Sequence, residues 1–320
     1  MRAGKRVLHS LSPRLRVAGA VLAAGTAVSA CGQSAPAVPG GAGGAQTRIL
    51  AVGAENEYAN VIAEVGGRYV SVSAILKDPN VDPHSFEASP SVANTVSAAR
   101  LIVQNGLGYD SFMNRIESAS PNRLRDVIDV RTLLGLPRST RNPHLWYAPT
   151  TMPRVASAVA RELSALQPEH ASYFRARERR FDATLKPWLA ALARFRRLYA
   201  GAPVATTEPV ADYMLQAAGA TILTPWILQA DIMNGVDPAP QDVTLQDNLF
   251  RDHRVKVFLY NRQVTNSITE SFLKLARHDH IPVVGVYETM PIGYSYASWM
   301  LAETRALTTA VAAGRSAAQL

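Results

Sequence analysis

The sequence has a single cysteine, Cys31, so no disulfide within the chain can stabilise its fold. The apolar run from Val17 to Val28 is too short to cross a bilayer as a helix. The patterns HExxH and GxSxG, typical of zinc peptidases and serine hydrolases, are both missing. These absences exclude a fold stabilised by disulfides. They also mean that no recognisable motif supports a hydrolase.

The first 31 residues have the layout of a lipoprotein signal with its lipobox. Basic residues come first, the apolar run Val17 to Val28 follows, and Val28-Ser29-Ala30 leads to Cys31. A cysteine in this place is where cleavage and lipid attachment would occur, so we expect lipidation at Cys31. The alternative is an ordinary secretory signal with an incidental cysteine. The basic residues are Arg2, Lys5, Arg6, Arg14 and Arg16.

The basic composition depends partly on that segment. The sequence has 33 basic and 25 acidic residues, and five of the basic ones precede Cys31, which leaves 28 against 25, or +3. This small excess does not predict binding to nucleic acid or to an anionic membrane, and no aromatic residues interleave to stack on bases. The remaining arginine cluster is expected to be the solvated face of a long helix. It comprises Arg175, Arg177, Arg179, Arg180, Arg194, Arg196 and Arg197.

Residues 32–47 are rich in Gly, Ala and Pro and contain no charged side chain, which predicts a flexible tether. About 270 residues remain from Arg48 onward. A chain of that length suits two lobes better than one.

The segment from Arg48 alternates between strands and helices. Arg48 to Gly53 and Val70 to Leu76 are strand-like, and Glu57 to Val65 between them has helical spacing. Ala99 to Gln104 is a further strand, ended by Asn105-Gly106-Leu107-Gly108, which tolerates positive φ. This order predicts an α/β fold built on a parallel sheet with helices on both faces. Ligands of such sheets bind at the carboxyl ends of the strands.

The second half repeats this alternation. A helix is expected from Met152 to about Gln167, followed by a long amphipathic run from Glu169 to Tyr199 that contains Pro187. Ile222 to Trp226 is interpreted as a strand that stops at Pro225 and Trp226, and Asn234 to Gln241 as a polar loop. The other expected strands are Val204–Thr206, Val255–Tyr260 and Ile281–Val286, and the expected helices are Val210–Ala218, Val243–Phe250, Asn266–Arg277 and Tyr294–Val311.

Two histidines follow prolines on loops, in Asp82-Pro83-His84 and in Asn142-Pro143-His144. Each proline fixes its own φ and biases the residue before it toward extended geometry, so each imidazole is presented by a stiffened turn. One histidine in a turn is usually a polar surface residue. Two in the same setting, about sixty residues apart, are harder to dismiss as surface residues.

Three stretches carry a resemblance to a known family: DPHSFEASP from Asp82, NGLGYDSFM from Asn105 and NPHLWYAP from Asn142. Together they resemble the solute-binding proteins of metal-uptake ABC transporters, the zinc and manganese group known as cluster A-I. The resemblance extends from about Arg48 to the C-terminus. It implies a monomeric lipoprotein on the extracytoplasmic face of the cell membrane, partnered by the permease and ATPase of an ABC importer.

The resemblance also implies an α/β architecture of two lobes, each a parallel sheet flanked by helices, joined by one long linking helix. The N-terminal lobe would span residues 48–168, the linking helix 169–200 and the C-terminal lobe 201–320. Pro187 leaves open the alternative of two separate helices packed within one lobe.

In the resembling family the metal lies between the lobes. Its ligands are matched here by His84, His144, Glu208 in Thr207-Glu208-Pro209, and Glu288 after the last strand. Two imidazoles and two carboxylates neutralise a divalent cation and form a borderline-hard ligand set, which suits Zn²⁺ or Mn²⁺ and not Cu⁺.

The choice between these metals stays open at this stage. Within the family, histidine at the position of Glu208 and a long His-rich loop accompany zinc, whereas glutamate there more often accompanies manganese. This chain has Glu208 and no His-rich tract between His84 and His144. The manganese group, however, commonly ends with aspartate where this chain has Glu288. Iron is a lesser alternative.

Two other functions were weighed. A metal hydrolase would need a carboxylate base, and Glu55 and Glu57 follow the first strand. They are expected instead to lie at a helix N-terminus, where the helix dipole favours their negative charge. A surface adhesin without a transport role is equally compatible with a lipid anchor.

Overall fold

The computed structural model describes residues 48–80 and 82–320, which belong to one compact unit. The expected lipoprotein signal, Cys31 and the tether lie outside the described residues. Among the helices of the described part, none is long and apolar enough to cross a membrane.

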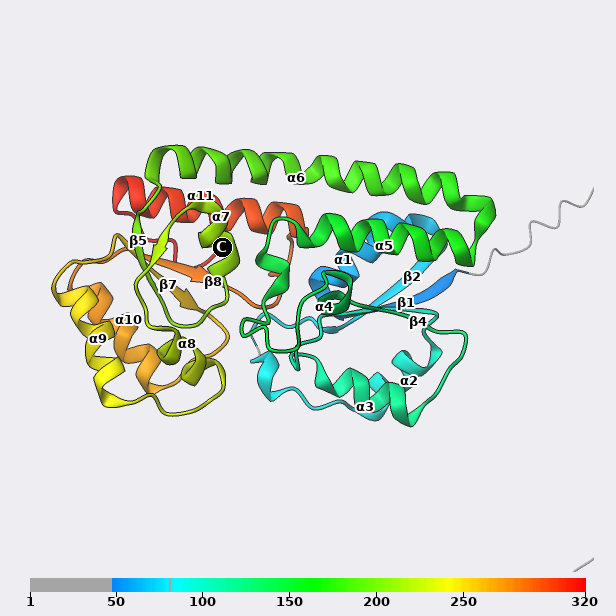
Figure 1. The fold of residues 1–320 in the computed structure, drawn as a ribbon, viewed down its shortest axis with the longest axis horizontal. Coiled ribbons are helices and arrows are strands. Elements are labelled where there is room, and N and C mark those ends of the chain that lie inside the picture. The colour runs from blue at the N-terminus through cyan, green and yellow to red at the C-terminus, as the bar shows by residue number, and fades with distance from the viewer. Residues whose placement is uncertain (1–47, 81) are drawn as a thin grey trace, which may run out of the picture. The chain divides into compact units, whose positions relative to one another are not determined.

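Two four-stranded parallel sheets form the framework of the two lobes (Figure 1). The strand orders are β2-β1-β3-β4 and β6-β5-β7-β8, so both lobes have the same topology. In each lobe the order reverses beside the first strand, and ligands of open α/β sheets bind at such a switch point, at the carboxyl ends of the strands. The strands are β1 (Ile49–Glu55), β2 (Val70–Leu76), β3 (Leu101–Gln104), β4 (Asp126–Asp129), β5 (Pro203–Thr206), β6 (Thr221–Ile222), β7 (Val257–Asn261) and β8 (Val283–Val286).

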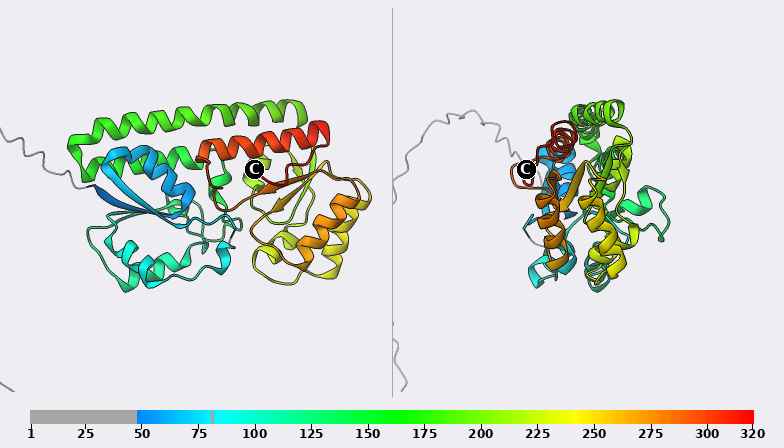
Figure 2. Two further views of the ribbon diagram at one scale, coloured as in Figure 1. Left: turned by 180° about the vertical axis from the view of Figure 1, so that it is seen from behind. Right: turned by 90° about the vertical axis from the view of Figure 1, so that its left-hand side faces the viewer.

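Helices flank both sheets, and the α/β fold of two lobes is confirmed (Figure 2). Those of the first lobe are α1 (Asn56–Gly66), α2 (Pro90–Ala98), α3 (Ser111–Ala119), α4 (Val130–Leu133) and α5 (Thr151–Leu166). Those that follow are α6 (Ala171–Tyr199), α7 (Asp212–Ala218), α8 (Trp226–Met233), α9 (Pro240–Arg251), α10 (Ser267–His278) and α11 (Tyr296–Ala313).

The linking helix α6 is continuous over 29 residues, with Pro187 in its interior. It packs against α5 and α1 of the first lobe and against α7 and α11 of the second, and runs along both lobes (Figures 1 and 2). Proline removes only one backbone hydrogen bond, and the buried side of the helix compensates through packing. The alternative of two separate helices is therefore wrong. The buried side chains are Phe174, Phe181, Leu185, Trp188, Leu192 and Phe195.

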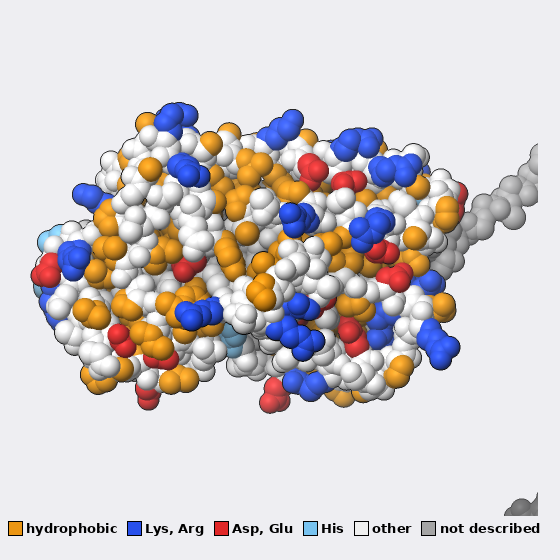
Figure 3. Space-filling view, in the orientation of Figure 1, with side chains coloured by type: hydrophobic (Ala, Val, Ile, Leu, Met, Phe, Trp, Pro, Cys, Tyr) orange, Lys and Arg blue, Asp and Glu red, His pale blue; other side chains and the backbone are white. Residues whose placement is uncertain are grey.

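The opposite side of α6 carries most of the arginine cluster, as predicted. Arg177 is the exception, since it is half-buried and its Nε donates to the Glu64 carbonyl at 2.6 Å. The exposed members are Arg175, Arg179, Arg180, Arg194, Arg196 and Arg197. Lys and Arg side chains line this edge of the molecule in Figure 3. The cluster is a solvated helix face, so it gives no support to a nucleic-acid partner.

The largest hydrophobic core extends through both lobes and is completed by α6 and α11. Several of its polar side chains are hydrogen bonded. Trp188 Nε1 donates to Thr304 Oγ1 at 3.1 Å, whereas the buried Trp146 indole N–H has no hydrogen-bond partner. Tyr296 of the second lobe donates from its hydroxyl to the Trp146 carbonyl of the first lobe at 2.6 Å. Because these groups are buried, separating the lobes here would leave them unsatisfied.

Two elements differ from the sequence prediction. The predicted strand Ile222–Trp226 is wrong, because β6 ends at Ile222 and Trp226 begins α8. Pro225 precedes the helix as its N-cap, a place where its missing N–H costs nothing, so it starts an element instead of stopping one. Strand β4 was not predicted, because it has only four residues and two of them, Asp126 and Asp129, are of a type that is rare in strands.

Candidate metal centre

The His84 imidazole is presented by a tight turn that follows β2. The Asp82 carboxylate accepts a hydrogen bond from the His84 N–H at 2.8 Å, and the Ser85 hydroxyl donates to the Asp82 carbonyl at 2.8 Å. Proline at the intervening position fixes φ, so this Asx-type turn holds the histidine backbone in one conformation. The His84 side chain keeps 27% of its surface exposed.

The His144 imidazole is fully buried and oriented by Asn142. The Asn142 Oδ1 atom accepts from the His144 N–H at 3.0 Å and lies 2.8 Å from His144 Nδ1. An amide oxygen can only accept, so Nδ1 carries a proton, and Nε2 is the nitrogen that faces Glu288 and is available to a metal. The Asn142 amide also donates to the Pro209 carbonyl at 2.8 Å, which ties this loop to the loop of Glu208.

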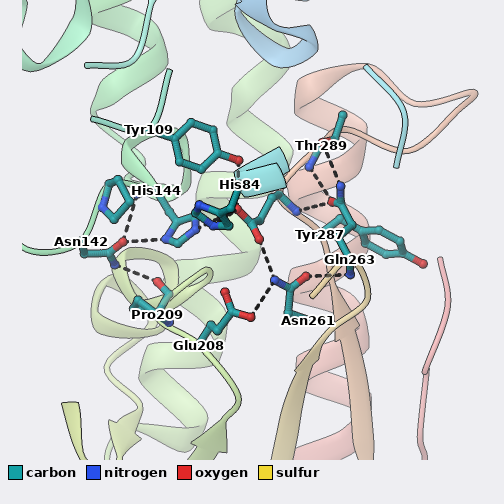
Figure 4. A network of polar contacts seen from close by, with 12 residues as sticks. His84, Tyr109, Asn142, His144, Glu208, Pro209, Asn261, Gln263, Tyr287 and Thr289 are labelled. Atoms are coloured by element: carbon teal, nitrogen blue, oxygen red, sulfur yellow. Dashed lines mark hydrogen bonds and ion pairs between the residues drawn. The ribbon is translucent and has the colours of Figure 1, made fainter. Parts of the chain in front are cut away.

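Glu288 contacts four side chains of the site, those of His84, Tyr109, His144 and Asn261, which Figure 4 labels. Its Oε2 atom is 3.2 Å from the Nε2 atoms of both His84 and His144, and accepts from the Tyr109 hydroxyl at 2.9 Å. Its Oε1 atom accepts from the Asn261 amide at 2.7 Å. Glu288 follows β8 and both histidines belong to the first lobe, so the three groups meet across the lobes.

This spacing fits a tetrahedral metal. The ligand atoms of His84, His144 and Glu288 all lie within 4.8 Å of one another. Donors bound at ~2.0 Å to a tetrahedral Zn²⁺ are separated by ~3.3 Å, because a tetrahedron's edge is about 1.6 times its centre-to-vertex length. The two separations of 3.2 Å between imidazole nitrogen and carboxylate oxygen match that edge.

The protonation states also suit metal binding. Burial works against an ionised Glu288, but the hydrogen bonds and charges of His144 and His84 outweigh it and hold the pKa of this carboxyl well below its usual range. Burial lowers the pKa of His144, which favours the neutral imidazole that a metal needs. Burial also opposes protonation of His84, yet the hydrogen bond and charge of Glu288 prevail and raise the pKa of this imidazole. Metal binding at His84 therefore competes with protonation of this imidazole.

Glu208, the fourth candidate ligand, lies beside this group and not within it. Its Oε1 atom accepts from the Asn261 amide at 3.3 Å, and that amide also donates to Glu288. Its Oε2 atom is buried without a hydrogen-bond partner. Burial and the charge of Glu288 raise the pKa of Glu208 well above its usual range. The structure thus brings three of the four predicted residues together and places Asn261 between the fourth and Glu288.

Sequence reasoning missed four polar residues that position the ligands: Tyr109, Asn142, Asn261 and Gln263. The Gln263 side-chain oxygen accepts from the Glu288 and Thr289 N–H groups at 2.7 and 2.8 Å, which fixes the backbone of the last loop. Tyr109 and Asn142 stand inside the quoted motifs, and Asn261 is the last residue of β7. Asn261 could have been predicted as a site residue, because it is a polar residue at the carboxyl end of a strand. No local sequence pattern distinguishes Gln263.

The prediction that Glu55 and Glu57 lie at a helix N-terminus is confirmed, but the helix dipole does not keep their carboxyl groups ionised. Glu55 is the N-cap of α1 and Glu57 lies in its first turn, but both carboxyl groups are buried and their oxygens lack hydrogen-bond partners. Burial raises the pKa of both well above the usual range, helped by the charge of Asp110 at Glu55 and of Glu288 at Glu57. Desolvation therefore outweighs the helix dipole, which is worth about 1 kcal/mol or less in most settings.

Glu57→Gln is expected to stabilise the metal-free protein at neutral pH. The folded carboxyl has a pKa above its ordinary value of 4.5, so its stabilising contribution is complete below pH 4.5 and is lost as pH rises toward the folded pKa. We therefore expect the substitution to raise the free energy of unfolding at pH 7 and to leave it unchanged near pH 4, where the carboxyl is neutral in both states. Denaturant unfolding at several pH values measures it. The exposed control Glu87→Gln should show no such trend; equal curves for both variants would contradict the argument.

Comparison with known families and proteins finds metal-binding relatives of this chain. The family described as ZnuA, zinc-uptake complex component A, periplasmic, matches residues 52–310. The manganese-binding lipoprotein MntA of Bacillus subtilis (strain 168) is 23% identical over 173 residues, which cover 52% of this chain and 55% of MntA. A putative metal-binding protein of Thermotoga maritima is 32% identical over 94 residues, 29% of this chain and 33% of that protein. The chain thus matches about half or less of the length of these relatives.

Solved structures share the fold. The periplasmic zinc-binding protein TroA from Treponema pallidum superposes with a TM-score of 0.70 at 18% identity, over 84% of this chain and 99% of TroA. A crystal structure of ZnuA gives a TM-score of 0.68 at 19% identity, over 83% of this chain and all of the other. At such low identity the likeness shows the two-lobed fold alone.

Proposed function

Because this chain belongs to the ZnuA family, the cluster A-I metal-binding solute-binding proteins of ABC transporters, we propose that it captures a divalent transition metal and delivers it to an ABC permease and its ATPase. The cargo is Zn²⁺ or Mn²⁺. The observation that carries the proposal is the convergence of His84, His144 and Glu288, with ligand atoms within 4.8 Å, from loops of both lobes.

Glu208 is proposed as the fourth ligand. Its buried, unpartnered Oε2 atom is an acceptor without a donor, a costly state that a cation would relieve. The Asn261 amide, which donates to both carboxylates, holds Glu208 near Glu288 until the metal arrives. Residues 48–168 and 201–320 are the lobes in this proposal, and 169–200 the link that limits their movement.

Metal binding should raise the thermal stability of the purified protein at neutral pH. A cation at ~100 times its Kd stabilises the folded state by ~2.7 kcal/mol. The gain should shrink below about pH 6.5, because the imidazole ligands must be deprotonated. Scanning calorimetry with Zn²⁺, Mn²⁺ and Fe²⁺ at pH 7.5 and 5.5, with Mg²⁺ as control, measures both effects. A melting temperature indifferent to every transition metal at pH 7.5 would refute metal capture.

Transport and adhesion can be separated in cells. A transport role predicts that deletion slows growth when zinc or manganese is scarce and that added metal restores it. Normal growth under both limitations would favour the adhesin.

Lipid anchoring through Cys31 is proposed from the sequence. Cys31 is the only thiol of the chain and follows small residues, so Cys31→Ala should abolish lipid attachment. Membrane fractionation and intact mass of the processed protein measure the result. Ser29→Ala, which leaves the cysteine in place, is the control. Unchanged mass and membrane attachment in Cys31→Ala would show that the anchor is elsewhere.

A further inference from the structure

A cavity opens beside His84. It is much larger than a metal ion requires. Its volume is about 540 Å³. A metal ion with six waters occupies roughly 180 Å³ at ~30 Å³ per water, whereas small-molecule sites run from about 300 to 1,000 Å³. The lining residues are His84, Leu107, Gly108, Tyr109, Arg141, Pro143, Trp226, Ala230, Met233 and Asn234.

The charge of this cavity is the wrong sign for a bare cation. None of the described residues that line it is a carboxylate, and Arg141 supplies a full positive charge. Arg141 is exposed, and no carboxylate of the described chain pairs with its guanidinium. A neighbouring cavity of about 300 Å³ shares Leu107 and Gly108 and is lined by Arg138 and by Arg131, whose guanidinium pairs with Asp129 at 3.6 Å, so Arg138 adds one further positive charge. Such a field repels free divalent cations and concentrates anions.

A bare cation has another approach. A separate cavity of about 360 Å³ also touches His84 and is lined by Asp82, Ser85 and Asn234 among others. Asp82 brings a carboxylate to this second cavity. The arginine-lined cavity is therefore not needed for access of the free ion, and its volume and charge call for another occupant.

Resting on the proposed metal capture, we propose that the arginine-lined cavity binds a small carboxylate-bearing chelator together with its metal. A carboxylate of the chelator pairs with the Arg141 guanidinium, a charge-assisted contact that can be bidentate. Its carbon skeleton lies against Trp226 and Met233 of α8, and the Asn234 amide offers a further hydrogen bond. The protein thus accepts the metal as an anionic complex as well as a free ion.

The solvent exposure of His84, His144 and Glu288 determines where a metal–chelator complex can enter. His84 keeps 27% of its side-chain surface exposed, while His144 and Glu288 keep none. A metal held by a chelator can therefore meet His84 first, with the chelator still in the cavity. His84 lines both cavities, so the two routes end at the same nitrogen.

The test is a binding experiment with citrate and nitrilotriacetate as probe chelators. Metal-free protein is titrated with Zn²⁺ alone, with each 1:1 zinc complex, and with each radiolabelled chelator without zinc. We expect labelled chelator to stay with the protein at one per chain only when zinc is present. Arg141→Gln should weaken this retention by about tenfold or more and leave binding of zinc alone unchanged or slightly tighter.

Arg194→Gln, the same change on the exposed face of α6, is the control. It should bind zinc alone and the zinc–chelator complexes as the wild type does. If both chelators only compete for zinc, by the same factor in all three proteins, the chelator site does not exist. If the wild type binds zinc in neither form, the proposed metal capture itself fails. Binding of zinc alone without retention of chelator overturns only this inference.

Discussion

Replacing Glu288 by glutamine is expected to lower the affinity for Zn²⁺ and Mn²⁺ by more than about 100-fold, since loss of a residue that merely orients a ligand typically costs 10- to 100-fold. Glu288 Oε2 is the atom that both imidazoles face, at 3.2 Å each. The amide of glutamine keeps the size of the side chain but removes the negative charge that offsets the cation. It also removes the partner that raises the pKa of His84.

Glu303→Gln is the matched control for that variant. Glu303 is also a buried carboxyl of the second lobe, accepting from the Tyr147 hydroxyl at 2.9 Å and the Trp299 indole at 2.7 Å. Burial raises its pKa to about 8, so it is already uncharged at pH 7 and its replacement removes no charge there. Titration calorimetry at pH 7 compares the two. Affinity within a few-fold of wild type in Glu288→Gln would mean that the metal lies elsewhere.

The repeated strand and helix pattern was readable because buried parallel strands are short aliphatic runs ended by turn residues. Val70 to Leu76 was predicted to the residue, and the Glu169 to Tyr199 run became α6. Helix α8 was not readable: its residues are apolar on several sides, so no helical stripe stands out, and Pro225 resembles a stop. Local pattern therefore identified the short buried strands by their length and turn residues, and the helices by an apolar face, but it failed at α8, which has neither signal.

The candidate metal centre likewise has features that the sequence could predict and features that it could not. His84 and His144 could be proposed because proline marks both turns in the sequence. The burial of Glu55 and Glu57 could not, because it depends on packing between α1 and residues far along the chain, such as Tyr296, whose N–H donates to Asn60. The gap between Glu208 and the three central residues depends on Asn261, which comes from a different strand. Distances between loops of separate strands are set by the assembled sheets and not by local sequence.

Replacing Glu208 by histidine is expected to shift selectivity from manganese toward zinc. The wild-type set of two imidazoles and two carboxylates would become three nitrogens and one oxygen, with Glu288 as the only negative ligand. Manganese prefers oxygen donors and should lose affinity, whereas zinc is well served by nitrogen-rich tetrahedral shells and should lose less or gain. We expect the ratio of zinc to manganese affinity to rise on the order of tenfold. Competition titration of both metals against one indicator measures that ratio.

Glu208→Gln separates the two physical causes. It keeps the length and an oxygen donor and removes only the charge, so both metals should weaken and the ratio should change less than in Glu208→His. Asn261 can still donate to the side-chain oxygen at position 208, as it does now at 3.3 Å, so the loop should keep its place. If the ratio is the same in the wild type and both variants, Glu208 does not touch the metal. Its unpartnered Oε2 would then be a feature of the apo loop alone, and the site would be the three residues His84, His144 and Glu288.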